Sequence, residues 1–516
     1  MKLAHSDPAD HPENLVDMAL QLQQFTQQAS ADGDSLYETE KRILEMVLRM
    51  GHLATDRFLQ LQGNGDLGPM VQTEDGVELQ RSEFPAKRLL RTVFGEHEFW
   101  AFVYASGPKQ RIALRPIDTR LSLPAGKASY LLEEFSQYFC VEQAFRPSAN
   151  ALHTVLGQKL SVDTLERINQ RVGQQAETYL DALPTPAAEE EGEVLVATAD
   201  GKGVPLIRDP VTAPPVHGPK PSRPGNRRMA TLACVYSVDP YVRTAEDVVA
   251  ALFRDDRKKD VPARPQPYHK RMTACFPTVD DVGTEDELRI RGDIRAWTWA
   301  AEQIHTRRRD GQVLVRLCDG QESLWNASDV CLGLEDDRQK RSKNVVDVLD
   351  VIHVSGYVWL AGRALYGKND SSVESFARDR FLRILRGDAA GVICGMRRMA
   401  TSHDLCGQKL KDITTACNYL ENNLQRMRYD ECLAAGYPIA SGVIEGACRH
   451  LVKDRMERTG MRWREPSAAS MLFVRALKVT GLWGPFQTHR QAAERKRLHS
   501  HRPLLDDYTP NTNIAF

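Results

Sequence analysis

Two hydrophobic periods alternate along this chain, and they predict where its helices and strands form. Apolar residues recur at helical intervals across residues 36–61, which predicts an amphipathic helix, and a second helix is expected over 13–28. Residues 89–105 change to a strand pattern interrupted by Gly95-Glu96, which predicts a β-hairpin. The N-terminal region is therefore expected to combine helices with one hairpin.

The next segment returns to the helical period. Helices are predicted at 128–144 and 148–156, followed by a short turn and a third helix that begins at Ser161 as its N-cap. This order resembles a helix-turn-helix unit, in which Arg167 and Arg171 could meet phosphates or base edges. Three-helix units are also common packing modules, so the spacing alone leaves both interpretations open.

Beyond residue 193 the pattern alternates between strand and helix. Strands are predicted at 194–199, 229–238, 312–317 and 345–349, with helices at 285–308, 322–334 and 353–365. This order predicts an α/β domain with a mixed sheet and helices on its faces. From 367 to 435 the pattern is helical only, with segments at 372–385, 389–400 and 408–424, which predicts an all-helical insertion.

These patterns predict a division of the chain into successive parts. Residues 184–193 contain two prolines and a run of like charges, both of which resist packing, so they are expected to form a linker. The predicted parts are 1–125 (helical and β-hairpin region), 126–183 (helix-turn-helix-like domain), 184–193 (linker), 194–366 (first part of the α/β core), 367–435 (insertion), 436–483 (second part of the core, with an apolar helix at 467–479) and 484–516 (mobile tail).

The composition is that of a globular protein with several domains. The 516 residues are 42% hydrophobic and 27% charged. The N-terminus is polar and there is no apolar run of membrane-spanning length, so a cytoplasmic protein without a membrane partner is expected. The ten cysteines include no Cys-x-x-Cys pair, which argues against a zinc ribbon and a disulfide framework.

The net charge of −1 shows no bias toward nucleic acid, but the distribution of charge along the chain does show one. Acidic residues concentrate at 189–193 and 335–337. Basic residues cluster at 223–228, 307–309 and 449–464. Clusters of this kind predict local contacts with a polyanion.

Three carboxylates stand where a sheet enzyme would place an active site. Asp200 is expected to end the first core strand and Asp319 the third, and each is followed by glycine. An Asp-Gly pair alone is more often a turn signal. Loops and ligands nevertheless meet at strand ends in α/β sheets. Glu445 supplies a third acid from the predicted helix 441–456, for which Ser441 is the expected N-cap.

That helix carries basic side chains after its acid. Arg449 and Lys453 follow Glu445 at spacings that place them on one side of a helix. An exposed helix with ordinary ion pairs has the same pattern. A carboxylate on a metal ion, with cations holding phosphates beside it, is the alternative. Three converging acids would suit two Mg²⁺ ions, with Asp200 bridging and Asp319 and Glu445 flanking.

The chain resembles one known family along most of its length after residue 129. The resemblance is carried by the segments 199–205, 318–320 with Trp325, 350–354, 436–450, 453–456 and 460–463. In these motifs the chain is similar to ISKra-type insertion-sequence transposases. These belong to the bacterial transposases that carry a DDE triad on a ribonuclease-H-like fold with a helical insertion, as in Mutator-like relatives.

The resemblance implies a fold, an activity and a set of residues. It implies an α/β ribonuclease-H-like catalytic domain with an all-α insertion and mainly helical N-terminal DNA-binding domains. Asp200, Asp319 and Glu445 would bind two Mg²⁺ ions, for which Mn²⁺ could substitute. Asp350 and His353 would support them, although a helix N-cap and a hydrogen-bonded core histidine are equally open. Relatives often carry a cysteine-pair zinc element ahead of the helix-turn-helix region, but residues 79–116 contain no cysteine.

The implied partner is double-stranded DNA, both the terminal repeats of the element and the target, bound by a homo-oligomer that associates with the nucleoid. The residues expected to contact DNA, besides the basic loop 223–228, are Lys202, Arg227, Arg228, Arg167, Arg171, Arg449, Lys453, Arg455 and Arg462. Two alternatives stay open. One is an inactive DNA-binding protein derived from a transposase, and the other is a ribonuclease-H-like nuclease without strand transfer.

Overall fold

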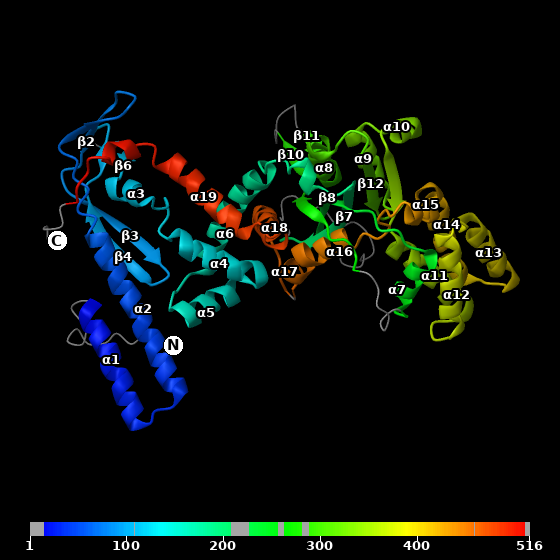
Figure 1. The fold of residues 1–516 in the computed structure, drawn as a ribbon, viewed down its shortest axis with the longest axis horizontal. Helices are drawn as coiled ribbons and strands as arrows, with labels where there is room; N and C mark the ends of the chain where they lie inside the picture. The colour runs from blue at the N-terminus through cyan, green and yellow to red at the C-terminus, as the bar shows by residue number, and fades with distance from the viewer. Residues whose placement is uncertain are drawn as a thin grey trace, which may run out of the picture. The chain divides into compact units, whose positions relative to one another are not determined.

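The computed structural model describes residues 15–107, 109–207, 227–255, 263–280, 288–458 and 460–510. The chain divides into two compact units, one of residues 1–179 with 482–516 and the other of residues 180–481 (Figure 1). Most of the predicted basic loop, residues 223–226, lies outside the described residues.

The first unit combines helices with two small sheets. The predicted N-terminal helices and hairpin are present as α1 (Leu15–Asp32), α2 (Leu36–Gln60) and the antiparallel pair β3 (Ala86–Thr92) and β4 (Gly95–Ala101). A second sheet has the order β1-β2-β5-β6. Its strands and the remaining helices are β1 (Met70–Gln72), β2 (Glu78–Arg81), β5 (Tyr104–Ala105), β6 (Ile112–Leu114), α3 (Pro116–Leu121), α4 (Tyr130–Glu142), α5 (Phe145–Leu156), α6 (Val162–Asp181) and α19 (Trp483–Leu498).

The predicted mobile tail is wrong for residues 484–498, which belong to α19. This helix is fixed by Arg490, which is 2% exposed and forms an ion pair with the buried Glu133 of α4. Glu133 also pairs with Arg171 of α6. An unpaired buried charge is costly, so these two arginines together make the burial of Glu133 tolerable. The sequence gives no sign of this contact because Glu133 lies 357 positions from Arg490.

The second unit is built on a five-stranded mixed sheet with the order β13-β12-β7-β8-β9. Strands β7, β8 and β9 form an antiparallel meander, and β12 and β13 run parallel to β7. The strands are β7 (Val194–Pro205), β8 (Arg227–Val238), β9 (Tyr268–Cys275), β12 (Val313–Cys318) and β13 (Val345–Leu349), with a separate hairpin of β10 (Thr278–Asp280) and β11 (Leu288–Ile290).

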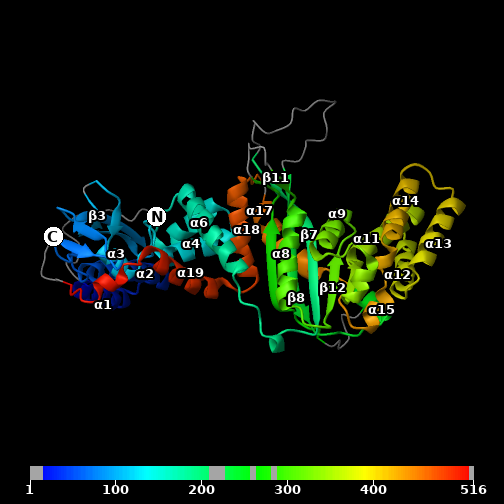
Figure 2. The same ribbon diagram turned by 90° about the horizontal axis from the view of Figure 1, so that it is seen from above.

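Helices cover this sheet, and the predicted insertion is helical. Helix α8 packs along β7, β8 and β9 (Figure 2). Its buried residues share a core with alternate residues of β7 such as Leu195 and Ala197. The insertion helices pack on α11. The helices are α7 (Ala245–Phe253), α8 (Gly292–Arg307), α9 (Glu322–Leu332), α10 (Asp337–Ser342), α11 (Val351–Tyr366), α12 (Ser372–Leu385), α13 (Ala389–Ser402), α14 (Gly407–Asn422), α15 (Tyr429–Ala434), α16 (Gly442–Ala447), α17 (Asp454–Met456) and α18 (Glu465–Val479).

Three details of this unit differ from the sequence prediction. Strand β9 was missed because its polar residues interrupt the strand pattern. One of them, Arg271, is buried and bonded to Gln303 at 2.8 Å. The helix expected from residue 285 begins at Gly292, because Leu288–Ile290 pairs with β10. The expected linker, residues 184–193, is also attached to the second unit, since Glu191 forms an ion pair with the buried Arg307 at 2.7 Å.

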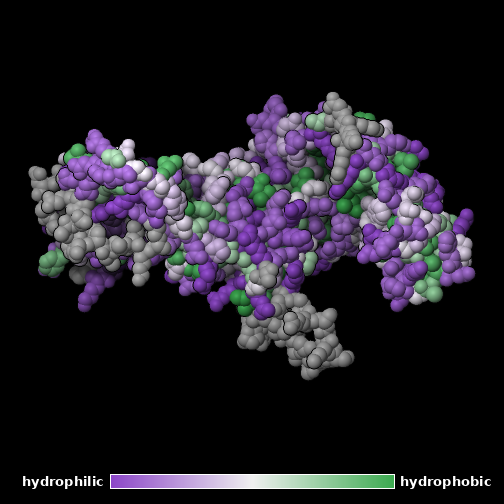
Figure 3. Space-filling view, turned by 90° about the horizontal axis from the view of Figure 1, so that it is seen from below, coloured by the Kyte–Doolittle hydropathy of each residue, from purple (hydrophilic) through white to green (hydrophobic). Residues whose placement is uncertain are grey.

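Apolar side chains are concentrated inside the units. The face in Figure 3 is mostly hydrophilic, with hydrophobic residues in scattered groups. Trp297 and Trp325 are fully buried in the core between the large sheet and helices α8 and α9, whereas Tyr104 centres a smaller core of the first unit. None of the helices within the described ranges is long and apolar enough to cross a membrane.

Candidate active site

The pairing of β12 with β7 brings two of the candidate acids level with each other. The parallel ladder joins Val313 to Val194 and Arg316 to Ala197, and the same offset continues to Asp319 and Asp200. The paired region ends before either aspartate. Both carboxylates therefore lie where the two central strands separate.

The sequence predicts that Asp200 ends its strand, but in the structure it does not. Strand β7 continues to Pro205 because the long strand β8 pairs with it on the other side, where Asp200 lies opposite Leu232. Alternation along β7 places Ala199 toward α8 and Asp200 toward the opposite face. The acid therefore faces the side of the sheet on which α16 packs against β7 and β8.

Hydrogen bonds from two neighbours orient the Asp200 carboxylate. The backbone N–H of Gly201 donates to Oδ1 at 2.7 Å, and the Cys448 thiol donates to Oδ2 at 3.2 Å. Burial raises the pKa of Cys448, and the negative charge of Asp200 raises it further. The thiol thus stays protonated and acts as a donor, a role that the sequence had not indicated.

Asp319 is held at the start of the loop after β12. Its Oδ1 accepts a hydrogen bond from the Gln321 N–H at 3.0 Å, and its backbone carbonyl accepts one from the Trp325 indole at 2.7 Å. Burial raises the pKa of Asp319, and the negative charge of nearby Asp200 adds to the rise. The two aspartates are therefore close enough to interact electrostatically.

The insertion reaches this loop through one tyrosine. The Gly320 N–H donates to Tyr419 Oη at 3.1 Å, and a Cβ on Gly320 would lie 2.3 Å from the Tyr419 ring. Only glycine fits at this position without a shift of the tyrosine. Tyr419 also stacks on Tyr357 with ring centroids 3.8 Å apart. The sequence carried no signal for this contact because Tyr419 lies 99 positions from Gly320.

Glu445 projects from α16 toward the same region. Burial raises its pKa, followed by the negative charge of Asp350, and Asp200 contributes as well. The ligand atoms of Asp350, His353 and Glu445 all lie within 4.8 Å of one another. Glu445 is therefore part of a compact cluster with Asp350 and His353, and the charge of Asp200 also raises its pKa.

Asp350 takes the N-cap role, one of the two roles that the sequence leaves open for it. It is the N-cap of α11, accepting the Ile352 N–H at 3.2 Å, and it is completely buried. Its carboxylate also accepts the Ser441 N–H at 3.0 Å and bonds His353 Nδ1 at 2.6 Å. Burial would raise the pKa of Asp350, but these hydrogen bonds hold it below its usual value. One carboxylate thus fixes the beginnings of two helices.

His353 lies close to the acids. Its hydrogen bond to Asp350 raises its pKa to about 9, and the charges of Asp319 and Glu445 also raise it. His353 is therefore protonated at neutral pH. The wider set of Asp200, Asp319 and Glu445 lies within electrostatic reach, although in the described part of the chain it does not form as compact a group as Asp350, His353 and Glu445.

The helix that carries Glu445 is continuous but irregular. Between α16 and α17, residues Cys448–Lys453 form a π-helical turn. Arg475 of α18 donates to the Leu451 carbonyl in this turn at 3.0 Å. Ser441 occupies the N-cap position, but no side-chain cap bond forms there. π-Turns are frequent at functional sites, and this one alters the simple spacing predicted for the helix.

The predicted DNA-contacting cations near the acids differ in their exposure. Arg449 is 71% exposed and only loosely paired with Asp454 at 3.7 Å, and Lys453 is also exposed. Arg455 contradicts its prediction. It is fully buried, with its guanidinium over the Trp463 ring at 4.8 Å, so it has no surface to offer a phosphate.

The remaining predicted cations are partly engaged within the protein. Arg227 pairs with Glu457 at 2.5 Å, Arg228 pairs with Glu465, and Arg171 pairs with Glu133. Arg167, Arg227 and Arg462 are exposed, while Lys202 is partly buried on β7 two residues after Asp200.

Comparisons with known proteins give little beyond this geometry. No protein-family model and no curated protein matches the chain. Among solved structures, the chain has a weak similarity to the Drosophila P element transposase strand transfer complex. The identity is 13% and the TM-score 0.22, over 73% of this chain and 91% of that one.

Proposed function

We propose that this chain is a DNA transposase with a ribonuclease-H-like catalytic core, in which Asp200, Asp319 and Glu445 form the catalytic triad. The observation that supports the proposal is that Asp200 lies within electrostatic reach of both Asp319 and Glu445. Two lie level on adjacent strands of a mixed sheet, and the third comes from a helix more than a hundred residues later. The motifs of the family resemblance coincide with these three positions.

The donor set fits Mg²⁺. All three proposed ligands offer carboxylate oxygens, which hard divalent cations prefer, and the pKa values of Asp319 and Glu445 are raised by burial and by their acidic neighbours. Such crowding of negative charge is relieved by a divalent cation. Two Mg²⁺ ions, or Mn²⁺ in their place, would stabilise the attacking and leaving oxygens of phosphodiester cleavage and strand transfer.

The residues around the triad would hold it in position. Asp350 anchors α11 and the start of the Glu445 helix, so its buried carboxylate fixes where Glu445 stands. The Cys448 thiol and the Gly201 N–H hold the Asp200 carboxylate in one orientation. His353 would supply a positive charge beside the acids.

DNA would be bound by exposed cations near the acids and by the helix-turn-helix-like helices. Arg449, Lys453 and Arg462 are exposed in the second unit, and Arg167 is exposed on α6 of the first. Phosphate contacts by such residues make affinity fall steeply with salt. Joining two element ends would require at least two copies of the chain on DNA.

The test is an in vitro reaction of purified protein with a terminal-repeat duplex, target DNA and Mg²⁺. Asp200→Asn, Asp319→Asn and Glu445→Gln should each reduce cleavage and joining by about 10³-fold or more while DNA binding is retained. Asp337→Asn, at a carboxylate that is 69% exposed on α10, is the matched control and should react normally. Hydrolysis without joined products would instead identify a nuclease, and DNA binding without either reaction an inactive derivative.

A further inference from the structure

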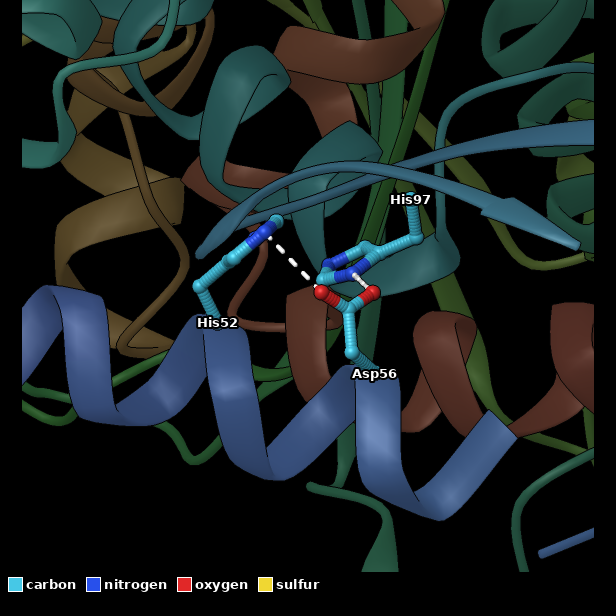
Figure 4. Close-up of side chains that lie close together, drawn as sticks. All are labelled: His52, Asp56 and His97. Atoms are coloured by element: carbon cyan, nitrogen blue, oxygen red, sulfur yellow. Dashed lines mark hydrogen bonds and ion pairs between the residues drawn. The ribbon is translucent and has the colours of Figure 1, made fainter. Parts of the chain in front are cut away.

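A second cluster of metal-ligating side chains lies in the first unit, between α2 and the β3–β4 hairpin (Figure 4). His52 and Asp56 project from the same face of α2 because they are one helical turn apart. His97 comes from β4, and its side chain is completely buried. The proposed triad plays no part in this cluster.

The three side chains converge on one point. Asp56 Oδ1 lies 2.6 Å from His97 Nδ1, and Asp56 Oδ2 lies 3.0 Å from His52 Nε2. The two imidazole rings stack with centroids 4.6 Å apart. One ligand atom from each residue falls within 4.8 Å of the others. Two imidazole nitrogens and the Asp56 carboxylate therefore lie together between α2 and the hairpin.

The opposite edge of each ring is fixed by the hairpin turn. His97 Nε2 lies 2.9 Å from Thr92 Oγ1, which also accepts the Phe94 N–H at 3.1 Å. His52 bonds to the Phe94 backbone, and a Cβ on Gly95 would lie only 2.7 Å from His52 Nδ1. Thr92 thus engages Nε2 of His97 and the hairpin turn lies close to Nδ1 of His52, while the other nitrogen of each ring faces Asp56. Outer partners of this kind orient histidine ligands of metal ions.

We propose that His52, Asp56 and His97 bind a divalent transition-metal ion, with Zn²⁺ as the best fit, and that this ion fastens the hairpin to α2. Zn²⁺ accepts imidazole nitrogen and carboxylate oxygen together, whereas Mg²⁺ prefers oxygen ligands. In the bound state Nδ1 of His97 would face the ion, and Nε2 would carry the ring proton and donate it to Thr92 Oγ1. The hydroxyl proton of Thr92 then points toward the Gly95 carbonyl, 3.5 Å away. A fourth position remains for water. The site does not depend on the proposed transposase activity.

The test measures zinc bound to the full-length protein after EDTA treatment and dialysis against Zn²⁺. His52→Gln and Asp56→Asn should each lose about one equivalent of zinc per chain relative to the unaltered protein. Both residues are only partly buried, so these variants are expected to fold, which far-UV circular dichroism checks. Zn²⁺ should raise the melting temperature of the unaltered protein by about 5 °C, and this rise should disappear in both variants.

Two controls separate this site from other zinc-binding groups. His450 and Asp454 have the same spacing on a helix and lie 3.1 Å apart, but no third ligand is grouped with them among the described residues. His450→Gln should keep the full zinc content. Glu445→Gln removes a proposed catalytic ligand and should also keep the zinc that His52→Gln loses. If the unaltered protein binds no more zinc than His52→Gln, or if Zn²⁺ leaves its melting temperature unchanged, the cluster is a hydrogen-bonded network and the proposal is wrong.

Discussion

Two clusters in this molecule pair histidine with carboxylate, and they differ in how the negative charge of the carboxylate affects the histidine. In the second unit, the buried Asp350 faces one histidine, and their hydrogen bond raises the pKa of His353 to about 9. In the first unit, Asp56 stands between His52 and His97, and burial lowers the pKa of His52. His353 carries its own positive charge, whereas His52 resists acquiring one.

The difference indicates which cation each cluster can accept. Asp350 is paired with His353 and anchors two helices, so in the second unit the acids proposed to bind an external ion are Asp200, Asp319 and Glu445. Their oxygens suit Mg²⁺. The nitrogen-rich cluster of His52 and His97 suits Zn²⁺ instead. A histidine beside an acid can therefore replace a metal ion or bind one, depending on which ring atoms are already engaged.

The largest expected effect comes from removing the buried carboxylate. Asp350→Ala leaves the Ile352 and Ser441 N–H groups without their acceptor and leaves His353 without its partner. We expect a loss of about 3 kcal/mol in the free energy of unfolding of the second unit, because the partners of a buried charge are left uncompensated. Urea denaturation measures it. A loss under about 0.5 kcal/mol, as expected for the exposed control Asp337→Asn, would mean that Asp350 is not an anchor.

The response to metal removal should differ between the clusters. EDTA is expected to lower the melting temperature of the first unit by about 5 °C, and restoring Zn²⁺ should reverse the change while Mg²⁺ should not. Calorimetry of the full chain resolves the two units if they melt separately, and limited proteolysis with fragment identification assigns them. Equal rescue by both ions would remove the distinction between a nitrogen site and an oxygen site.

The charge of His353 predicts a definite pH dependence in metal-free protein. Its pKa is raised from 6.5 to about 9 on folding, so its contribution is complete below pH 6.5 and is lost as the pH rises toward 9. His353→Gln should therefore lower the free energy of unfolding by about 1–2 kcal/mol at pH 6 and by almost nothing above pH 9, where the histidine is deprotonated. The cost at pH 6 is modest because the side chain is partly exposed. Unfolding measured across this range provides the check, and a cost independent of pH would show that His353 is neutral.

The smallest expected effect concerns the cations beside the acids. Arg449→Gln removes an exposed charge and should lower the slope of log affinity against log salt by about 0.9, whatever the DNA sequence. Arg455→Met removes a buried charge and should leave that slope unchanged while destabilising the fold. Fluorescence anisotropy over a salt series measures both. A change of slope in Arg455→Met would restore it as a DNA contact.

The sequence predicted those parts of the fold that depend on local periodicity. The core strands β12 and β13 and the insertion helices α12, α13 and α14 lie close to their predicted positions, and β7 begins at its predicted residue but continues to Pro205. The predictions failed where a polar residue is buried by a distant partner. Arg271 in β9 and Arg490 in α19 look exposed in sequence, and only their contacts with Gln303 and Glu133 explain their burial.

The same limit applies to the sites. Asp200, Asp319 and Glu445 could be nominated from strand patterns and motifs, and the fold brings them within electrostatic reach of one another. Their roles stay a prediction. Tyr419, Cys448 and the His52 cluster could not be nominated, because each acts across a long separation in sequence. His97 lies 41 positions from Asp56, and no local pattern marks the pair.

The most direct test of the central claim is strand-transfer activity in single-residue variants with DNA binding measured in parallel. Asp200→Asn, Asp319→Asn and Glu445→Gln should each abolish cleavage and joining in Mg²⁺ while binding the terminal-repeat duplex as tightly as the unaltered protein does in metal-free buffer. Unimpaired joining by any one of these variants would remove that residue from the triad and contradict the account.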